Sequence, residues 1–577
     1  MTDPYSLQEK TEAISVKIEN PGIAEACWPD HTETFKNTVT GPDGKCNLIY
    51  RDFHIGSIHL PCFASPPVQL FMVSLVCFFC PGMFNALAGL GGGGKVDTKL
   101  ADEMYFVENV ALYSTFALFG FFSGPMVNYL GVKITLAVGG TGFCVYTASL
   151  LASVIYPESS KVYAFNIFGG AFVGLCAALL WTAQGTIMVS YPHENQKGQY
   201  FAWFWAIFNM GAVLGSLIPL AQNVHVTENK TVNKNTYIVF LILMVFGSLI
   251  ALCLCNAKDV IRDDFSRVIL MKNPTLWSEL TGMWETIQFE WTIILLFPMF
   301  WSSNWFYTYQ QNGINAAHFS TRTKALNSLL YYFAQILAAF FLGYCLDSDY
   351  RSRVWRGRVN LVFLFSLTCF LWGVGYVWQR TYTRKTVSDP SFSPTDWTNA
   401  KYGGPLLLYI CYGAYDALWQ ASVYWYLCRS PMYMGALSNS GRRTANYIGF
   451  YKGFQSAGSA VTWALDSHKI LYMSEYASNF GLLAGSLLIA APAIFLKLKN
   501  TVDLEGDIAN TGENIEDVRP KLELTDSVVF EHDRYKARTR VSRQNGDLRI
   551  YRERSMSTPT PGPLKIRPLT PEGGKVA

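Results

Sequence analysis

Charged residues are scarce through the middle of this sequence. The chain has 577 residues, of which 15% are charged, and nearly half of the charged residues lie in two tails, 1–67 and 498–577. The roughly 430 residues between the tails are only about 11% charged, against about 25% in an ordinary soluble domain. So few charges cannot coat a water-soluble globule of that size, which excludes a soluble enzyme. The net charge of +4 is nearly balanced, so we expect no nucleic-acid partner.

Other common signatures are also missing. The first long apolar run begins near Val68, too late for a secretory signal peptide. The 13 cysteines lie in the N-terminal tail or inside apolar runs, so no external disulfide framework is expected. No His, Cys and acidic residues have the spacing of a metal site, and no nucleophile is paired with a base in a recognisable context. We therefore expect no metal, no cofactor and no enzymatic activity.

Apolar runs of about 20 residues, the length that spans a bilayer, recur between the tails. They predict an all-α, multi-pass integral membrane protein with twelve transmembrane helices in two six-helix halves. The lipid bilayer is therefore the first partner that we expect for this protein. The runs are 68–90, 104–127, 132–155, 162–190, 199–221, 237–255, 290–311, 325–346, 359–379, 405–428, 444–466 and 477–497.

The runs also predict the domain organisation. The two halves are 68–255 and 290–497, and a charged cytoplasmic linker at 256–289 joins them. The tails at 1–67 and 498–577 have the composition of mostly disordered segments.

Two signals orient the chain in the membrane. Arginines are more frequent in the loops that would lie inside, such as 351–358, than in most of the other loops. Asn229-Lys-Thr is an N-glycosylation sequon in the loop after the fifth run, which the same topology places outside. We therefore expect a glycoprotein with both termini in the cytoplasm. The sequence does not distinguish the plasma membrane from an endomembrane.

Polar residues follow a regular pattern among the runs. The interiors of the third, sixth, ninth and twelfth runs carry no acid, base or amide, whereas the other eight runs carry several. Polar groups are costly in lipid unless they face protein or water. The pattern predicts that every third helix faces lipid and that the remaining helices surround a polar path for a small solute or an ion.

Asp416, near the middle of the tenth run, is the strongest single candidate on this path. Tyr412 and Gln420 share its helix face at spacings of four residues. Two interpretations remain open: a proton- or cation-coupling carboxylate, or a structural acid that a hydroxyl or Lys452 neutralises. Lys452 itself could extend to the membrane surface, pair with Asp416 or bind an anionic substrate.

Several amides and one further acid complete the candidate path. Glu108 lies in the outer third of the second run, where either an outer vestibule or simple solvation explains it. The amide- and aromatic-rich segment 303–311 fits either a ligand pocket or an interfacial aromatic belt. The remaining candidate residues are Asn304, Gln310, Gln311 and Gln455.

A short motif recurs at the inner end of the second helix of each half. In both places a glycine is followed four residues later by Asn or Asp. Glycine lets neighbouring helices approach closely, and the Asn or Asp side chain can cap the next helix. The repetition favours a duplicated transporter with two gating loops. The gating-loop residues are Gly124, Asn128, Gly131 and Lys133 in the first half, and Gly343 and Asp347 in the second.

Composition, helix count and the loop at 124–133 resemble the major facilitator superfamily, in which Asp normally occupies the position of Asn128. Residues 68–497 resemble more closely its Unc-ninety-three-like branch, in the fungal form. The strings that carry this resemblance include Cys80-Pro-Gly-Met-Phe-Asn-Ala-Leu, Leu180-Trp-Thr-Ala-Gln-Gly-Thr, Phe297-Pro-Met-Phe, Ser303-Asn-Trp-Phe-Tyr-Thr-Tyr-Gln and Tyr447-Ile-Gly-Phe-Tyr-Lys-Gly-Phe-Gln. The resemblance implies a facilitator fold but no substrate, because the branch includes proteins viewed as potassium-channel regulators or as trafficking partners of receptors.

Two functions follow as hypotheses. The first is a secondary transporter of a small or medium organic solute or an ion, working by alternating access, with a proton as the candidate coupling ion. The second is a facilitator-fold protein that no longer transports and instead regulates or escorts another membrane protein. Buried ionisable residues favour the first hypothesis, and Asn128 leaves room for the second.

Overall fold

The chain separates into two units in a computed structural model, Leu48–Leu522 and Met1–Asn47 with Glu523–Ala577. The structure describes residues 48–50, 53–55, 58–89, 99–156, 159–193, 196–223, 234–262, 277, 291–348, 350–389, 391–429, 441–498, 538–544 and 547–553. The smaller unit contributes an antiparallel hairpin, β3 (Arg538–Gln544) and β4 (Asp547–Glu553), in which Arg538 faces Glu553. Asn229 lies outside the described residues, so its glycosylation stays a prediction.

The first half of the larger unit is a group of long helices. It begins with η1 (Leu48–Tyr50) and a small antiparallel hairpin of β1 (Phe53–Ile55) and β2 (Ile58–Leu60). The helices are α2 (Pro66–Cys77), η2 (Phe78–Gly82), α3 (Met83–Gly89), α4 (Lys99–Leu130), α5 (Val132–Ile155), α6 (Ser160–Ser190), α7 (Lys197–Asn223) and α8 (Lys234–Ala251), followed by η4 (Ala257–Asp259).

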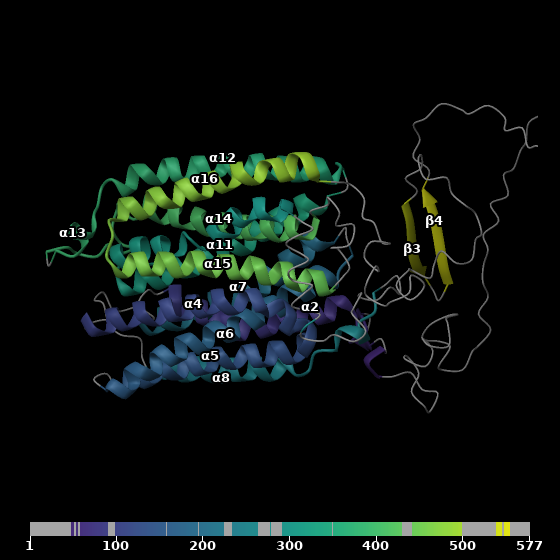
Figure 1. Ribbon diagram of the computed structural model, residues 1–577, viewed down its shortest axis with the longest axis horizontal. Helices are drawn as coiled ribbons and strands as arrows, with labels where there is room; N and C mark the ends of the chain where they lie inside the picture. The colour runs from purple at the N-terminus through teal and green to yellow at the C-terminus, as the bar shows by residue number, and fades with distance from the viewer. Residues whose placement is uncertain are drawn as a thin grey trace, which may run out of the picture. The chain divides into compact units, whose positions relative to one another are not determined.

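The second half repeats this arrangement. Its elements are η5 (Trp291–Leu296), α10 (Phe297–Ser302), η6 (Tyr309–Ala316), α11 (Thr321–Asp347), α12 (Arg353–Gln379), α13 (Arg384–Val387), α14 (Gly403–Arg429), α15 (Gly441–Ser467) and α16 (Tyr472–Lys497). We call the end of the bundle where α2 begins and α16 ends the tail end, and the opposite end the α13 end (Figure 1).

The first helical segment of each half is interrupted. In the first half, the π-helical η2 contains Pro81, which has no backbone N–H to donate within the helix. In the second half, turns at 303–306 and the π-helical η6 separate α10 from α11. Such interruptions leave backbone and polar side chains pointing inward, which membrane proteins tolerate where the segment lines a cavity or packs on protein.

At the centre of the bundle, two helices of the first half cross two helices of the second half. Figure 1 shows α12 and α16 along one edge, α5 and α8 along the other, and α4, α7, α11 and α15 between them. The halves meet where α4 packs on α15 and α7 packs on α11. A methyl group added to Gly120 would lie 2.7 Å from the Gly453 Cα, and one added to Gly343 would lie 2.6 Å from the Gly198 carbonyl oxygen. Glycine at these positions therefore sets the spacing of the two halves.

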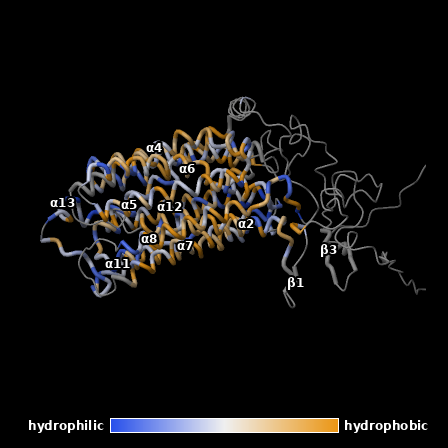
Figure 2. The backbone as a smooth tube through the Cα atoms, turned by 90° about the horizontal axis from the view of Figure 1, so that it is seen from below, coloured by the Kyte–Doolittle hydropathy of each residue, from blue (hydrophilic) through white to orange (hydrophobic). Residues whose placement is uncertain are grey.

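Among the described residues, nine helices are long and apolar enough to cross a membrane. Hydrophobic residues run along the helices and hydrophilic ones gather toward the ends of the bundle (Figure 2). The three remaining runs of the sequence fall on the interrupted 291–316 segment and on α14 and α15, which are helical but carry more polar residues. An all-α membrane fold is thus confirmed, whereas the count of twelve spanning helices stays a prediction.

Candidate functional site

A cavity of about 90 Å³ lies between the two halves, near the middle of the bundle. Its first wall comes from the first half and is mainly aromatic, and its second wall comes from the second half and is mainly polar. The aromatic wall contains Phe84, Tyr113, Phe116, Phe143, Trp181 and Phe208, together with one amide, Asn85. The polar wall contains Asn304, Tyr307, Gln335, Gln420, Lys452 and Gln455.

Asp416 lies directly behind the polar wall. Its carboxylate is fully buried and accepts hydrogen bonds from the Tyr307 hydroxyl at 2.9 and 3.1 Å. The Gln420 amide donates to it at 3.3 Å and the Tyr331 hydroxyl at 3.4 Å. Three neutral donors therefore hold the carboxylate, and two of them, Tyr307 and Gln420, also face the cavity.

Lys452 reaches the same cavity from α15. Its ammonium donates to the Gln455 side-chain oxygen at 2.8 Å. It also lies 4.6 Å from the ring centre of Tyr451, 4.9 Å from that of Trp181 and 5.3 Å from that of Tyr424. The ammonium is thus buried among three π faces, each of which attracts a cation, and Lys452 does not extend to the surface as one of our interpretations proposed.

Amides connect the buried acid to the buried base. The Gln455 amide donates to the side-chain oxygens of Asn304 at 2.8 Å and Gln420 at 3.1 Å, and Gln420 in turn donates to Asp416. The Tyr451 hydroxyl also donates to Gln420. Within the described residues Asp416 and Lys452 form no direct ion pair, so Gln420 and Gln455 carry the contact between them. A change of charge at either end would alter this network through hydrogen bonds rather than through direct contact.

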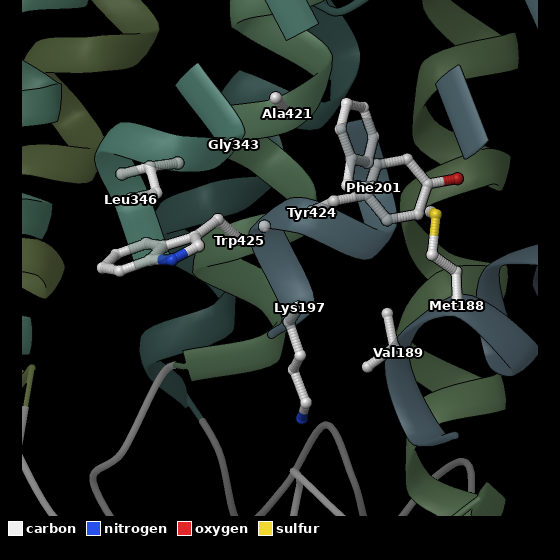
Figure 3. Close-up of a pocket in the computed structure, with 10 residues that line it drawn as sticks. Met188, Val189, Lys197, Phe201, Gly343, Leu346, Ala421, Tyr424 and Trp425 are labelled. Atoms are coloured by element: carbon white, nitrogen blue, oxygen red, sulfur yellow. The ribbon is translucent and has the colours of Figure 1, made fainter. Parts of the chain in front are cut away.

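Toward the tail end, a smaller and mostly apolar pocket of about 10 Å³ lies next to the cavity. Figure 3 shows Phe201, Leu346, Tyr424 and Trp425 around it, with Lys197 at the start of α7. Tyr424 lines this pocket, and its ring also faces the Lys452 ammonium of the central cavity. The lining of this pocket comes from both halves of the bundle.

The gating-loop residues lie at this same end. The Asp347 carboxylate accepts a hydrogen bond from the Gln199 backbone N–H at 2.7 Å, which caps the beginning of α7. In the other half, a methyl group on Gly124 would lie 2.7 Å from the Asn446 Cα, so α4 and α15 are in backbone contact there. Gly131 has a φ of 80°, a value that glycine adopts freely, and it is followed by Lys133 at the start of α5.

Three candidate residues lie away from the cavity. Glu108 is buried on α4 and packs against Gly170 of α6. Gln310 and Gln311 are buried on η6, where Gln310 accepts a hydrogen bond from Tyr331 at 2.8 Å. Their segment therefore supports the shell behind Asp416, and of the three amides in the string at 303–311 only Asn304 reaches the cavity.

The structure also adds residues that the sequence pattern did not single out. Trp181 and Tyr451 contact the Lys452 ammonium, although each is an aromatic residue in an apolar run and has no sequence signal that distinguishes it from a packing residue. The expected lipid-facing helices largely agree with the lining, since α8, α12 and α16 contribute no residue to the cavity and α5 contributes only Phe143. The start of α16 differs from our expectation: it lies at Tyr472 rather than at 477, which brings Glu475 and Asn479 into its first two turns.

Comparisons with known proteins agree on one family. A family model described as Major Facilitator Superfamily matches residues 109–462. An UNC93-like protein of Schizosaccharomyces pombe is 45% identical over 89% of this chain and 95% of its own length. UNC93-like protein 1 of Arabidopsis thaliana is 36% identical over 76% of this chain and 92% of its own length. The solved structure of the proton:xylose symporter XylE covers 77% of this chain and 99% of its own, with 10% identity and a TM-score of 0.51, which supports the fold alone.

Proposed function

Because the chain belongs to the major facilitator superfamily, in its UNC93-like branch, we propose that it is a secondary transporter of a small solute or ion. Alternating access would expose the central cavity first to one side of the membrane and then to the other. The observation that carries this proposal is one hydrogen-bonded network at the cavity that connects a buried carboxylate, Asp416, to a buried ammonium, Lys452, through Gln420 and Gln455. Ionisable groups at such depth are costly and mark substrate or ion paths in membrane proteins.

The two walls of the cavity suggest the chemistry of the substrate. Aromatic side chains on the first wall suit a flat or apolar portion, and the amides and the Lys452 ammonium on the second suit a polar or anionic group. The cavity of about 90 Å³ is well below the several hundred Å³ of a drug-sized pocket, so a small solute fits this conformation better than a large one.

Asp416 is the proposed coupling residue. A carboxylate held by neutral hydroxyl and amide donors has no fixed counter-charge in contact with it, so protonation and deprotonation are both accessible changes of state. Either change reaches the cavity through Tyr307 and Gln420, which touch both the carboxylate and the open space. We propose a proton as the coupled ion, with both termini cytoplasmic and Asn229 on the outer or lumenal side.

The test uses the purified full-length protein in vesicles that contain a pH-sensitive dye. A panel of small organic acids, amino acids and sugars is added in turn, with protein-free vesicles as the control. We expect at least one compound to drive proton movement that empty vesicles do not show.

The regulator hypothesis is the alternative outcome of that test. It draws on Asn128, a neutral amide at the position that matches Asp347, the residue that caps α7. If no compound moves protons or accumulates, and the protein instead copurifies with one channel or receptor whatever residue 416 is, the transport proposal is wrong.

A further inference from the structure

A second buried polar site lies at the α13 end of the second half, separate from the central cavity. It is a pocket of about 10 Å³ between the 305–309 segment, α15 and α16, with Thr308, Thr462, Glu475, Ser478 and Asn479 among its lining residues. A space of this size holds about one water molecule or one ion of similar size.

Charged groups at one edge of this pocket do not balance. The Arg384 guanidinium forms ion pairs with Asp466 and with Glu475, the latter at 2.6 Å, and packs 4.1 Å from the Tyr472 ring centre. The second oxygen of Asp466 accepts a hydrogen bond from Asn312 at 2.8 Å. Among the described residues, these ion pairs place one cation against two buried carboxyl groups, so one formal negative charge has no cationic partner of its own in a region of low dielectric.

Two side chains of the pocket have unused hydrogen-bonding atoms. The second carboxylate oxygen of Glu475 and both amide atoms of Asn479 have no hydrogen-bond partner among the described residues. Glu475 is only 7% exposed and Asn479 only 1%. Buried polar atoms without partners are costly, and the two oxygens among them, one from Glu475 and one from Asn479, indicate an electropositive ligand that supplies the missing contacts.

The atoms of this pocket that can coordinate a cation are all oxygens, which are hard ligands. They are a carboxylate from Glu475, an amide carbonyl from Asn479 and the hydroxyls of Thr308, Thr462 and Ser478. Calcium needs six to eight oxygens with more negative charge, and magnesium keeps several waters that this space cannot hold. The excess charge is about one unit, which a monovalent ion neutralises.

We propose that this pocket binds one monovalent alkali-metal cation between Glu475 and Asn479. The binding itself does not depend on transport, so the site goes beyond the function proposed above. It is nevertheless adjacent to the central cavity, because Trp305 and Thr308 of the pocket neighbour Asn304 and Tyr307 of the polar wall in the chain. The Trp305 indole N–H donates to Ser478 at 3.0 Å, so the same segment contacts both sites.

The experiment measures thermal unfolding of the purified full-length protein in sodium chloride, potassium chloride and N-methylglucamine chloride at equal ionic strength. A ligand that binds only the folded state raises the melting temperature in proportion to its saturation of the site. We expect a saturable increase in sodium or potassium over N-methylglucamine. Glu475→Gln and Asn479→Leu should each abolish the increase, whereas Ser486→Ala, on the same helix but outside the pocket, should retain it.

Glu475→Gln has a second readout that keeps the test decisive. Because it removes the excess negative charge, this variant should melt in N-methylglucamine no lower than the wild-type protein. Equal melting of the wild-type protein in all three salts, or a cation effect that survives both Glu475→Gln and Asn479→Leu, would each overturn the proposal. Should Asn479→Leu fail to fold, Asn479→Ser replaces it, with a weaker cation response expected.

Discussion

The two walls of the central cavity differ in kind although the two halves share one architecture. The first half contributes seven aromatic side chains and a single amide to the lining, whereas the second half contributes four amides, one ammonium and one phenol and holds Asp416 behind them. Asp416 and Lys452, the two ionisable residues in contact with the cavity network, both belong to the second half. In the transport that we propose, this difference would assign substrate fit to the aromatic wall and the response to charge to the polar wall.

The largest expected effect comes from neutralising the acid of the polar wall. Asp416→Asn keeps the size and most hydrogen bonds of the side chain but removes its titration. We expect gradient-driven uptake in vesicles to fall at least about tenfold, which corresponds to about 1.4 kcal/mol, while exchange of bound substrate is retained. The protein should reach normal abundance, because Gln420 and Gln455 rather than Asp416 contact Lys452 and its environment.

The protein abundance of Asp416→Asn is the measurement that can contradict this prediction. If Asp416→Asn lowered abundance and Lys452→Gln restored it, the two residues would be a structural ion pair, and breaking a buried pair costs about 3–5 kcal/mol. Rescued abundance with unchanged transport would remove Asp416 from the coupling mechanism.

The distance between the two walls can be altered by a substitution where α4 crosses α15. Gly120→Ala would place a methyl group 2.7 Å from the Gly453 Cα, and overpacking of this kind costs about 1–3 kcal/mol. We expect a melting temperature several degrees lower in detergent and reduced uptake. Gly373→Ala on α12 is the matched control, because nothing lies within 4 Å of its added methyl group. Equal melting of the two variants would show that the crossing does not set the spacing.

A substitution on the aromatic wall should have a smaller effect, and it should alter the KM of uptake rather than its pH dependence. Phe116→Leu replaces one aromatic ring of the cavity by a smaller aliphatic side chain. We therefore expect the KM of uptake to rise a few-fold, which is a loss of about 1 kcal/mol or less in binding free energy, with the pH dependence of uptake unchanged. Phe119→Leu on the same helix is the control, since Phe119 is 39% exposed on the outside of the bundle. A changed pH profile in Phe116→Leu would contradict the division between the walls.

How much of this could be read from the sequence depends on the type of residue. Apolar length and the spacing of polar residues predict the helices and the depth of Asp416, because lipid makes exceptions to the apolar pattern costly, whereas they left the depth of Lys452 open. The pattern could not tell Trp181 and Tyr451, which surround Lys452, from aromatic residues that only pack. It also placed Gln310 on the ligand path, since the turns at 303–306 that rotate its segment depend on tertiary packing.

The smallest expected effect tests an acid of the second half that lies outside the membrane-spanning helices. Asp396 accepts hydrogen bonds from Arg322 at 2.5 and 2.8 Å, from Ser320 at 2.7 Å and from Thr398 at 2.9 Å. Arg322 and these hydroxyl donors hold the pKa of the Asp396 carboxyl well below its usual value. A lowered pKa in the folded state adds stability above the unfolded pKa of about 3.9, and this stability is lost as the pH falls below it.

Asp396→Asn should therefore melt slightly lower than the wild-type protein at pH 7. Its free energy of unfolding should be smaller by about 1 kcal/mol or less, because the pair is close to solvent. The difference should shrink as the pH falls below about 4, and uptake should not change. If Asp396→Asn reduced gradient-driven uptake as much as Asp416→Asn, the effect of neutralising an acid would not be specific to the wall of the cavity, and the contrast between the two walls would lose its meaning.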